Sequence, residues 1–79
     1  MPQWTVYSRP HCSLCEQLLH ELAGLLPVEE ASRVAVIDIG QNAELERKYG
    51  TRVPVLVADN EFVCAYRLDA ARVRALLGR

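Results

Sequence analysis

A stripe of leucines separates two β-branched segments in the first half of the chain. Leucines recur at near-helical spacing over residues 14–26, so one face of this stretch is apolar, and we expect a helix that begins at Ser13 and ends before Pro27. Residues 4–8 and 33–39 are rich in apolar and β-branched side chains, and both predict strands. The second of these runs is nearly continuous, which is typical of a strand covered on both faces.

Two more helices are expected in the second half of the chain. Asn42 is suited to cap the first of them, and Gly50 is suited to close it as the residue after the last turn. Asp69 is suited to cap the second, whose apolar residues recur on one face.

A hairpin is expected between these two helices. Residues 54–58 predict a third strand, and the Asp59-Asn60 pair favours the positive φ of a two-residue turn. Residues 61–67 should therefore return as an antiparallel fourth strand. Alternation along that strand predicts that Phe62 and Cys64 share one face of the sheet.

These elements predict a single domain over residues 1–79, of mixed α/β (α+β) class, in the order β-α-β-α-β-β-α. We expect the strands joined by helices to run parallel and the hairpin to be antiparallel, which gives a four-stranded mixed sheet flanked by helices. A chain of 79 residues is long enough for one modest core and no more.

The net charge and the first residues of the chain bear on the partners and on the compartment to expect. Nine Lys and Arg residues against ten Asp and Glu leave a net charge of −1, so we expect neither nucleic acid nor a membrane surface as partner. The first residues show no basic segment followed by a long apolar run, the pattern of a secretory signal. We therefore expect a cytoplasmic protein. In that reducing compartment a close cysteine pair is more often catalytic or metal-binding than structural.

The pair Cys12 and Cys15 offers such chemistry, in the motif Cys-Ser-Leu-Cys, where the first strand gives way to the helix. Residues three apart at a helix start lie about 5–6 Å from each other at Cβ, near the separation that a disulfide needs. The free N–H groups and partial positive charge of the helix start stabilise a thiolate at Cys12, which we expect to be the more exposed of the two. Cys15 would be the resolving thiol that attacks a mixed disulfide on Cys12.

Two other functions share this motif. Cys12 and Cys15 are also half of a zinc site, or ligands of a cluster shared between two chains, although His11 and His20 do not form a second ligand pair at zinc-site spacing. The pair is also compatible with a non-catalytic redox-sensing or binding module that keeps the bridge without turnover. Cys64, alone on a predicted strand, is expected to be an inert buried residue.

Two segments resemble the signatures of glutaredoxins. Residues 7–15 are similar to the family's active-site segment, in which a strand, a basic residue and Cys-Pro-Tyr-Cys follow one another. Residues 49–56 are similar to its second signature, Thr-Val-Pro, whose proline is cis. More narrowly, the chain resembles the short bacterial glutaredoxin-like proteins of uncharacterised function. The resemblance implies a thioredoxin-like fold and a thiol–disulfide oxidoreductase in which Cys12 is the nucleophile and Cys15 its resolving partner.

The resemblance also implies a set of substrate-binding residues. Arg9 matches the basic residue that meets the glycine carboxylate of glutathione, and Val53 would offer its backbone N–H and C=O to glutathione or to a substrate cysteine segment as an added strand. Pro54 would be cis and lie against the cysteine loop. Asp69 is the one residue here that matches the segment holding the γ-glutamyl end of glutathione.

The implied partners are disulfide-containing proteins or glutathione. Glutathione is the possible co-substrate, and either it or a thioredoxin-type reductase would supply electrons. We expect no resident cofactor, no metal and a monomeric protein.

Overall fold

Every predicted strand and helix is present in the structure, a computed structural model that describes residues 2–78. In chain order the elements are β1 (Trp4–Ser8), α1 (Ser13–Leu25), α2 (Val28–Ala31), β2 (Ala35–Asp38), the 3₁₀ turn η1 (Ile39–Gln41), α3 (Ala43–Tyr49), β3 (Val55–Ala58), β4 (Glu61–Ala65) and α4 (Ala70–Leu77). The additions to the predicted order are α2 and η1, which are too short for a periodic pattern to reveal them. None of the helices within residues 2–78 is long and apolar enough to cross a membrane.

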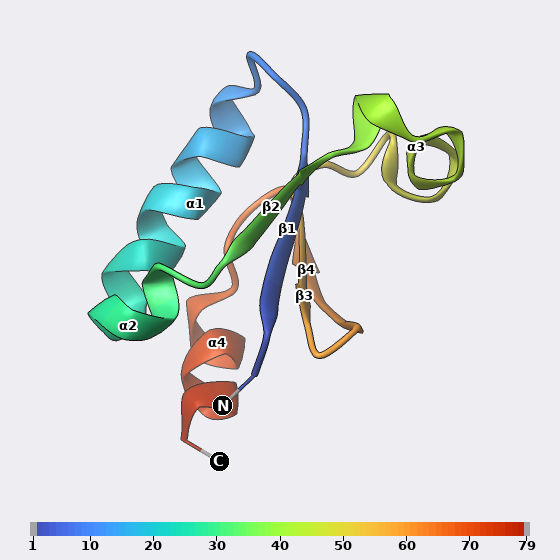
Figure 1. Ribbon diagram of the computed structural model, residues 1–79. Helices are drawn as coiled ribbons and strands as arrows, with labels where there is room; N and C mark the ends of the chain where they lie inside the picture. The colour runs from blue at the N-terminus through green and yellow to red at the C-terminus, as the bar shows by residue number, and fades with distance from the viewer. Residues whose placement is uncertain (1, 79) are drawn as a thin grey trace.

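The strands form one mixed sheet in the order β2-β1-β3-β4. β1 runs parallel to β2 and antiparallel to β3, and β3 and β4 form the predicted antiparallel hairpin. The expectation that strands joined by helices run parallel is therefore right for β1 and β2 and wrong for β3. The chain reverses beyond the end of β2, where η1 and α3 lie (Figure 1), so β3 enters the sheet in the opposite direction.

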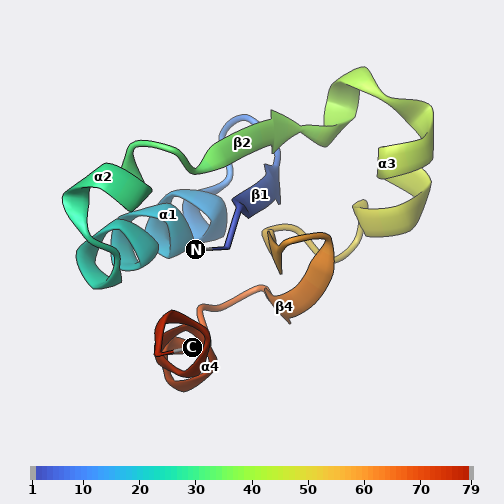
Figure 2. The ribbon, with the colours of Figure 1, turned by 60° about the horizontal axis from the view of Figure 1, so that its bottom comes forward.

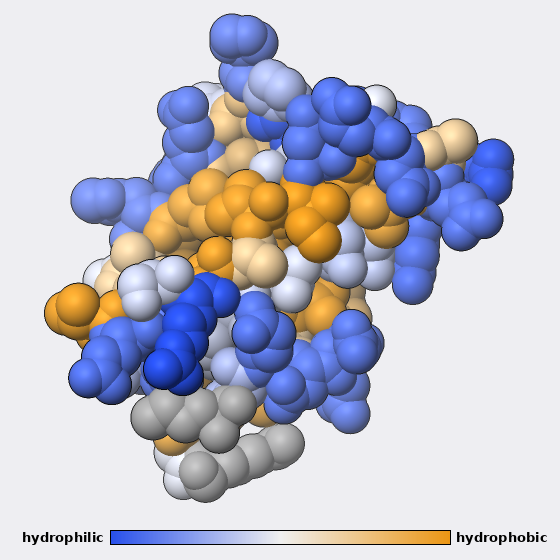
Figure 3. All heavy atoms as spheres, viewed as in Figure 1, coloured by the Kyte–Doolittle hydropathy of each residue, from blue (hydrophilic) through white to orange (hydrophobic). Residues whose placement is uncertain are grey.

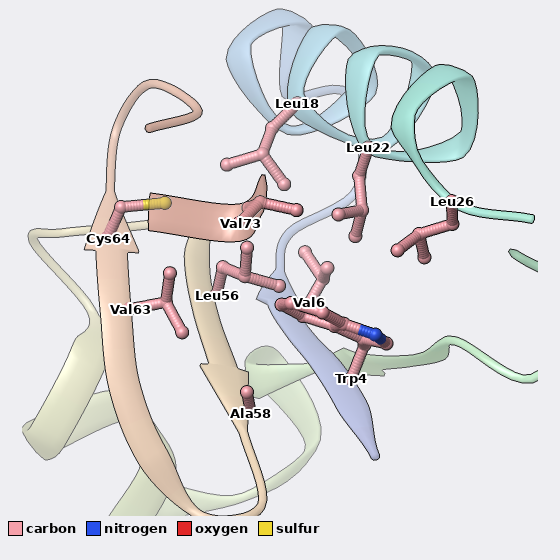
Figure 4. Close-up of a cluster of buried hydrophobic side chains, with 10 residues drawn as sticks. All are labelled: Trp4, Val6, Leu18, Leu22, Leu26, Leu56, Ala58, Val63, Cys64 and Val73. Carbon is pink, nitrogen blue, oxygen red and sulfur yellow. The ribbon is translucent and has the colours of Figure 1, made fainter. Parts of the chain in front are cut away.

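Helices cover both faces of the sheet. Figures 1 and 2 show α1 and α4 on one face and α3 on the other. Side chains of β3 alternate accordingly, because Leu56 packs toward α1 and α4 whereas Val55 and Val57 pack toward α3. The larger core cluster, shown in Figure 4, consists of Trp4, Val6, Leu18, Leu22, Leu26, Leu56, Ala58, Val63, Cys64 and Val73. The smaller one consists of Ile39, Tyr49, Val55 and Val57.

Strand β2 differs from its expected environment. Its continuous apolar run predicted cover on both faces, but β2 lies at an edge of the sheet and Val36 is 53% exposed. In Figure 3, which takes the view of Figure 1 with β2 in front, apolar atoms form a band across the middle of this surface. The prediction was wrong because valine and isoleucine favour any strand, whether one of its faces is covered or both.

A bulge breaks the alternation of β4. The register of β3 against β4 shifts between Leu56 and Val57, so Val63 is an extra residue in β4. Val63 and Cys64 consequently both enter the larger core cluster, and Phe62 is 49% exposed. The prediction that Phe62 and Cys64 share a face is wrong for this reason.

Candidate active site

Cys12 and Cys15 lie where β1 leads into α1. Cys12 is the N-cap residue of α1, with an extended backbone (φ −106°, ψ 105°), and its Sγ accepts a hydrogen bond from the backbone N–H of Cys15 at 3.2 Å. The Cα atoms of the two residues are 5.2 Å apart, and their sulfurs are at disulfide distance. The helix start itself thus positions the outer sulfur, and the predicted bonding reach of the pair is confirmed.

The two cysteines differ in exposure. Cys15 is 2% exposed because it lies on the buried face of α1 with Leu18 and Leu22, whereas Cys12 is half-buried. Since α1 is 13 residues long, its terminal N–H groups and partial positive charge act on the sulfur of Cys12. A thiol or disulfide arriving from solution therefore meets Cys12 first.

The start of β3 lies at the same end of the sheet as the cysteine loop. Tyr7 near the end of β1 pairs with Val55, the first residue of β3, so the segments that adjoin them leave the sheet together. The peptide bond between Val53 and Pro54 is cis, and the Pro54 side chain is fully buried. Within residues 2–78 the backbone N–H and C=O of Val53 make no backbone hydrogen bond. These two groups are the kind that an added extended segment pairs with.

The side chain of Arg9 is paired with groups of the same chain. Its guanidinium forms a two-pronged ion pair with the carboxylate of Glu46 on α3, in which Nη1 donates to Oε2 at 3.0 Å and Nη2 donates to Oε1. Nη2 also donates to the carbonyl oxygen of Gly50 at 3.0 Å. The resemblance assigns a carboxylate of glutathione to Arg9, and in the structure an internal carboxylate holds that guanidinium.

Gly50 makes room for this ion pair. It was expected to close α3, and it is indeed the C-cap residue, but its φ of −50° is right-handed, so no left-handed closing residue is involved. A Cβ at this position would overlap the carbonyl oxygen of Glu46 and lie 3.2 Å from Nη2 of Arg9. Close packing is therefore what requires glycine here. Glu46 carries no signal of this role in the sequence, because no local pattern marks a pair that is 37 residues apart.

Asp69 serves as a helix cap. Its Oδ1 accepts a hydrogen bond from the backbone N–H of Arg72 at 3.1 Å, at the start of α4. The residues just before it border the cysteine motif instead, because Tyr66 and Leu14 line one cavity of about 140 Å³ beside α1. The backbone N–H of Tyr66 also donates to the carbonyl oxygen of Pro54 at 2.9 Å. Tyr66, which the sequence did not mark as a site residue, thus links this segment to the start of β3.

Cys64 is separate from the pair of Cys12 and Cys15. It is 8% exposed within the larger core cluster, as predicted, and burial raises the pKa of its thiol while a hydrogen bond from the backbone of Asp69 partly offsets that rise. No three His, Cys, Asp or Glu side chains gather at a single point in the described part of the chain, residues 2–78.

Comparisons with solved structures support the fold. Protein Ne2328 from Nitrosomonas europaea, solved by NMR in solution, is 35% identical with a TM-score of 0.82, over 95% of this chain and 89% of that one. The protein XcR50 from X. campestris is 33% identical with a TM-score of 0.70, over 95% of each chain. Thioredoxin from Fasciola hepatica, at 19% identity and a TM-score of 0.56, covers 99% of this chain with 79% of its own and shares the fold alone.

The family model agrees as well. The model of the glutaredoxin-like domain (DUF836) matches residues 3–78, which is nearly the whole chain. No curated protein matches. The mixed sheet with helices on both faces is a thioredoxin-like fold, and the chain belongs to the glutaredoxin-like domain family (DUF836).

Proposed function

We propose that this protein is a thiol–disulfide oxidoreductase that exchanges disulfides through Cys12 and Cys15. The observation that carries the proposal is the pairing of a reachable sulfur at a helix N-terminus with a buried sulfur at disulfide distance. This difference in exposure separates the two roles, because the outer thiolate meets the substrate and the inner thiol resolves the product.

In the reducing direction the Cys12 thiolate attacks one sulfur of a substrate disulfide. A new S–S bond forms between Cys12 and that sulfur, the substrate bond breaks, and the departing thiolate takes up a proton. Cys15, once deprotonated, attacks the Cys12 sulfur and releases the second substrate thiol. Two electrons pass to the substrate, and the Cys12–Cys15 disulfide that remains is reduced by glutathione or by a thioredoxin-type reductase.

The backbone of Val53 supports a polypeptide as substrate. Its N–H and C=O have no backbone partner within residues 2–78, and they lie at the end of the sheet where the cysteine loop begins. An extended segment around a substrate cysteine would add there as a short strand. The reaction needs no resident cofactor, since the two sulfurs carry both electrons, and it suits the reducing cytoplasm with a disulfide-containing protein or glutathione as partner.

The test is multiple-turnover reduction of a model disulfide with a thiol in excess as electron donor. Cys12→Ser should abolish turnover. In a separate incubation with the disulfide and no donor thiol, Cys15→Ser should stall as a mixed disulfide on Cys12 that mass spectrometry identifies. Cys64→Ala is the matched control, because it removes a cysteine outside the pair and should retain turnover.

Two outcomes would contradict the proposal. Reversible formation of the bridge with no turnover on any disulfide would indicate a redox-sensing or binding module. Purification with one equivalent of zinc, lost in Cys15→Ser, would indicate a metal-binding protein.

A further inference from the structure

We propose that Glu46 sets the substrate selectivity of this site by occupying Arg9. Paired in this way, Arg9 lends no attraction to small anionic thiols, so their exchange at this site gains no rate from its charge. The inference rests on the proposed exchange reaction and adds a statement about which thiols take part in it. Glu46 acts through Arg9 and is a positioning residue.

The guanidinium of Arg9 connects the segment before Cys12, to which Arg9 belongs, with the segment before Val53, to which Gly50 belongs. Arg9 is three residues before Cys12, so their Cα atoms are at most about 11 Å apart even along an extended chain. On its other side, Nη2 donates to the carbonyl oxygen of Gly50, three residues before Val53. An unpaired charge on Arg9 would act on a ligand of Cys12 at low salt, because the Debye length rises from about 10 Å at an ionic strength of 0.1 M to about 30 Å at 0.01 M.

Glu46 cancels that charge. The planar carboxylate faces the planar guanidinium with one oxygen on each terminal nitrogen, which is the strongest geometry for this kind of pair. The carbonyl oxygen of Gly50 accepts a further hydrogen bond from Nη2 of Arg9. The absence of a Cβ at Gly50 lets the guanidinium, the carboxylate and this carbonyl come together. The side chains of Arg9 and Glu46 are 37% and 40% exposed, so a ligand in solution meets a neutral pair at this place.

The consequence for substrates follows from charge. Glutathione carries more negative than positive charge at neutral pH, so an unpaired cation near the attacked sulfur attracts it. With Arg9 neutralised, the groups left for recognition include the unpaired backbone of Val53, the surface beside Leu14 and Tyr66, and the cation of Arg52. The first two select an extended polypeptide by shape and backbone hydrogen bonds, whatever its charge.

The experiment compares an anionic with a neutral thiol on the oxidised protein. Glutathione or 2-mercaptoethanol attacks the Cys12 sulfur as its thiolate, the Cys12–Cys15 bond breaks, and the sulfur of Cys15 leaves and takes up a proton. A second thiol then releases the oxidised small molecule from Cys12. The measured quantity is the ratio of the two second-order rate constants, glutathione over 2-mercaptoethanol.

Glu46→Gln should raise this ratio about 3- to 10-fold at low salt, because it frees the charge of Arg9. This increase in the ratio should be smaller at high salt, and the double variant with Glu46→Gln and Arg9→Gln should not show it. Arg9→Gln alone should lower the ratio below that of the parent protein, because it leaves the carboxylate of Glu46 unpaired. Glu44→Gln is the matched control, since it removes the same charge from α3 without touching the ion pair, and it should leave the ratio unchanged.

The two proposals fail in different ways. If both thiols reduce the protein but Glu46→Gln and Arg9→Gln leave the ratio where it was, the role of Glu46 is refuted and the exchange reaction stands. If neither thiol reduces the parent protein, the exchange reaction itself is refuted. The rate with 2-mercaptoethanol also serves as the internal measure that each variant has an intact site.

Discussion

Tyr66 ties the end of the hairpin to the segment before β3 through Thr51. Its hydroxyl donates a hydrogen bond to the carbonyl oxygen of Thr51 at 3.0 Å, and its backbone N–H donates to that of Pro54 at 2.9 Å. Its φ of 68° is left-handed, which turns the chain out of β4 toward α4. One residue therefore holds the chain on both sides of Val53, whose backbone we propose as the substrate contact.

Removing the Tyr66 hydroxyl should cost little stability. Tyr66→Phe keeps the ring and the backbone bond, and it should lower the free energy of unfolding by about 0.5–1 kcal/mol, because a partly exposed hydrogen bond contributes modestly. Urea denaturation of the oxidised protein measures the change. Tyr7→Phe is the control, because the Tyr7 ring stacks on Tyr49 with centroids 4.4 Å apart and the substitution keeps that stacking. An equal loss in both variants would show that the Thr51 contact contributes nothing.

Alkylation of the reduced protein should follow the order of exposure. Cys12 is half-buried at a helix N-terminus, while Cys15 and Cys64 are 2% and 8% exposed. Iodoacetamide at neutral pH should therefore modify Cys12 first, because attack needs both a thiolate and access to it. Peptide mass spectrometry over a time course gives the three rates. Modification of Cys64 as fast as Cys12 would contradict the burial that the structure assigns to it.

Cys64 should make the stability of the oxidised protein fall at alkaline pH. Burial raises the pKa of its thiol, so the folded protein keeps this proton at a pH where the unfolded chain has lost it. The contribution is complete below about pH 8.5, the ordinary value for cysteine, and is lost as the pH rises through the pKa of the folded state. Thermal or denaturant unfolding across that range should show a smaller decline in Cys64→Ala than in the parent. Parallel declines would mean that Cys64 does not titrate on unfolding.

The helices, strands and turns of this fold could be predicted from the sequence, because caps, turns and apolar periodicity depend on residues close together in the chain. Asn42 caps α3 as expected, with its Oδ1 accepting hydrogen bonds from the N–H groups of Glu44 and Leu45 at 2.9 and 3.2 Å. Asp59 and Asn60 adopt the positive φ values that a tight hairpin needs, 49° and 68°. The edge position of β2, the bulge in β4 and the direction of β3 depend on neighbours far away in the chain. No pattern within a single segment specifies them.

The candidate site likewise has one part that the sequence predicts and one part that only the tertiary fold reveals. The spacing of Cys12 and Cys15 by itself predicts that they can bond, because residues three apart at a helix start have side chains within bonding reach. Arg9 was identified as a site residue, but its partner Glu46 comes from a helix that only the tertiary fold brings to it. The role assigned to Arg9 therefore changes once Glu46 is known to be its neighbour. The sequence alone suggests a cation free to bind a ligand, whereas the structure shows a cation already paired with a carboxylate.

Glycine-to-alanine substitutions should separate packing from helix propensity. Gly24 lies inside α1, where a Cβ would project into open space, so Gly24→Ala should stabilise the protein by about 0.5–1 kcal/mol through a stiffer unfolded chain. Gly50 also has a right-handed backbone, yet its Cβ would overlap the carbonyl of Glu46. Gly50→Ala should therefore destabilise by about 1–3 kcal/mol, as overpacking does.

Unfolding of the two variants under the same conditions should give shifts of opposite sign. Gly50→Ala should in addition displace Arg9 from Glu46, and it should raise the rate ratio of glutathione to 2-mercaptoethanol as Glu46→Gln does. A stabilised Gly50→Ala protein would mean that Glu46 does not approach position 50 as closely as the structure shows.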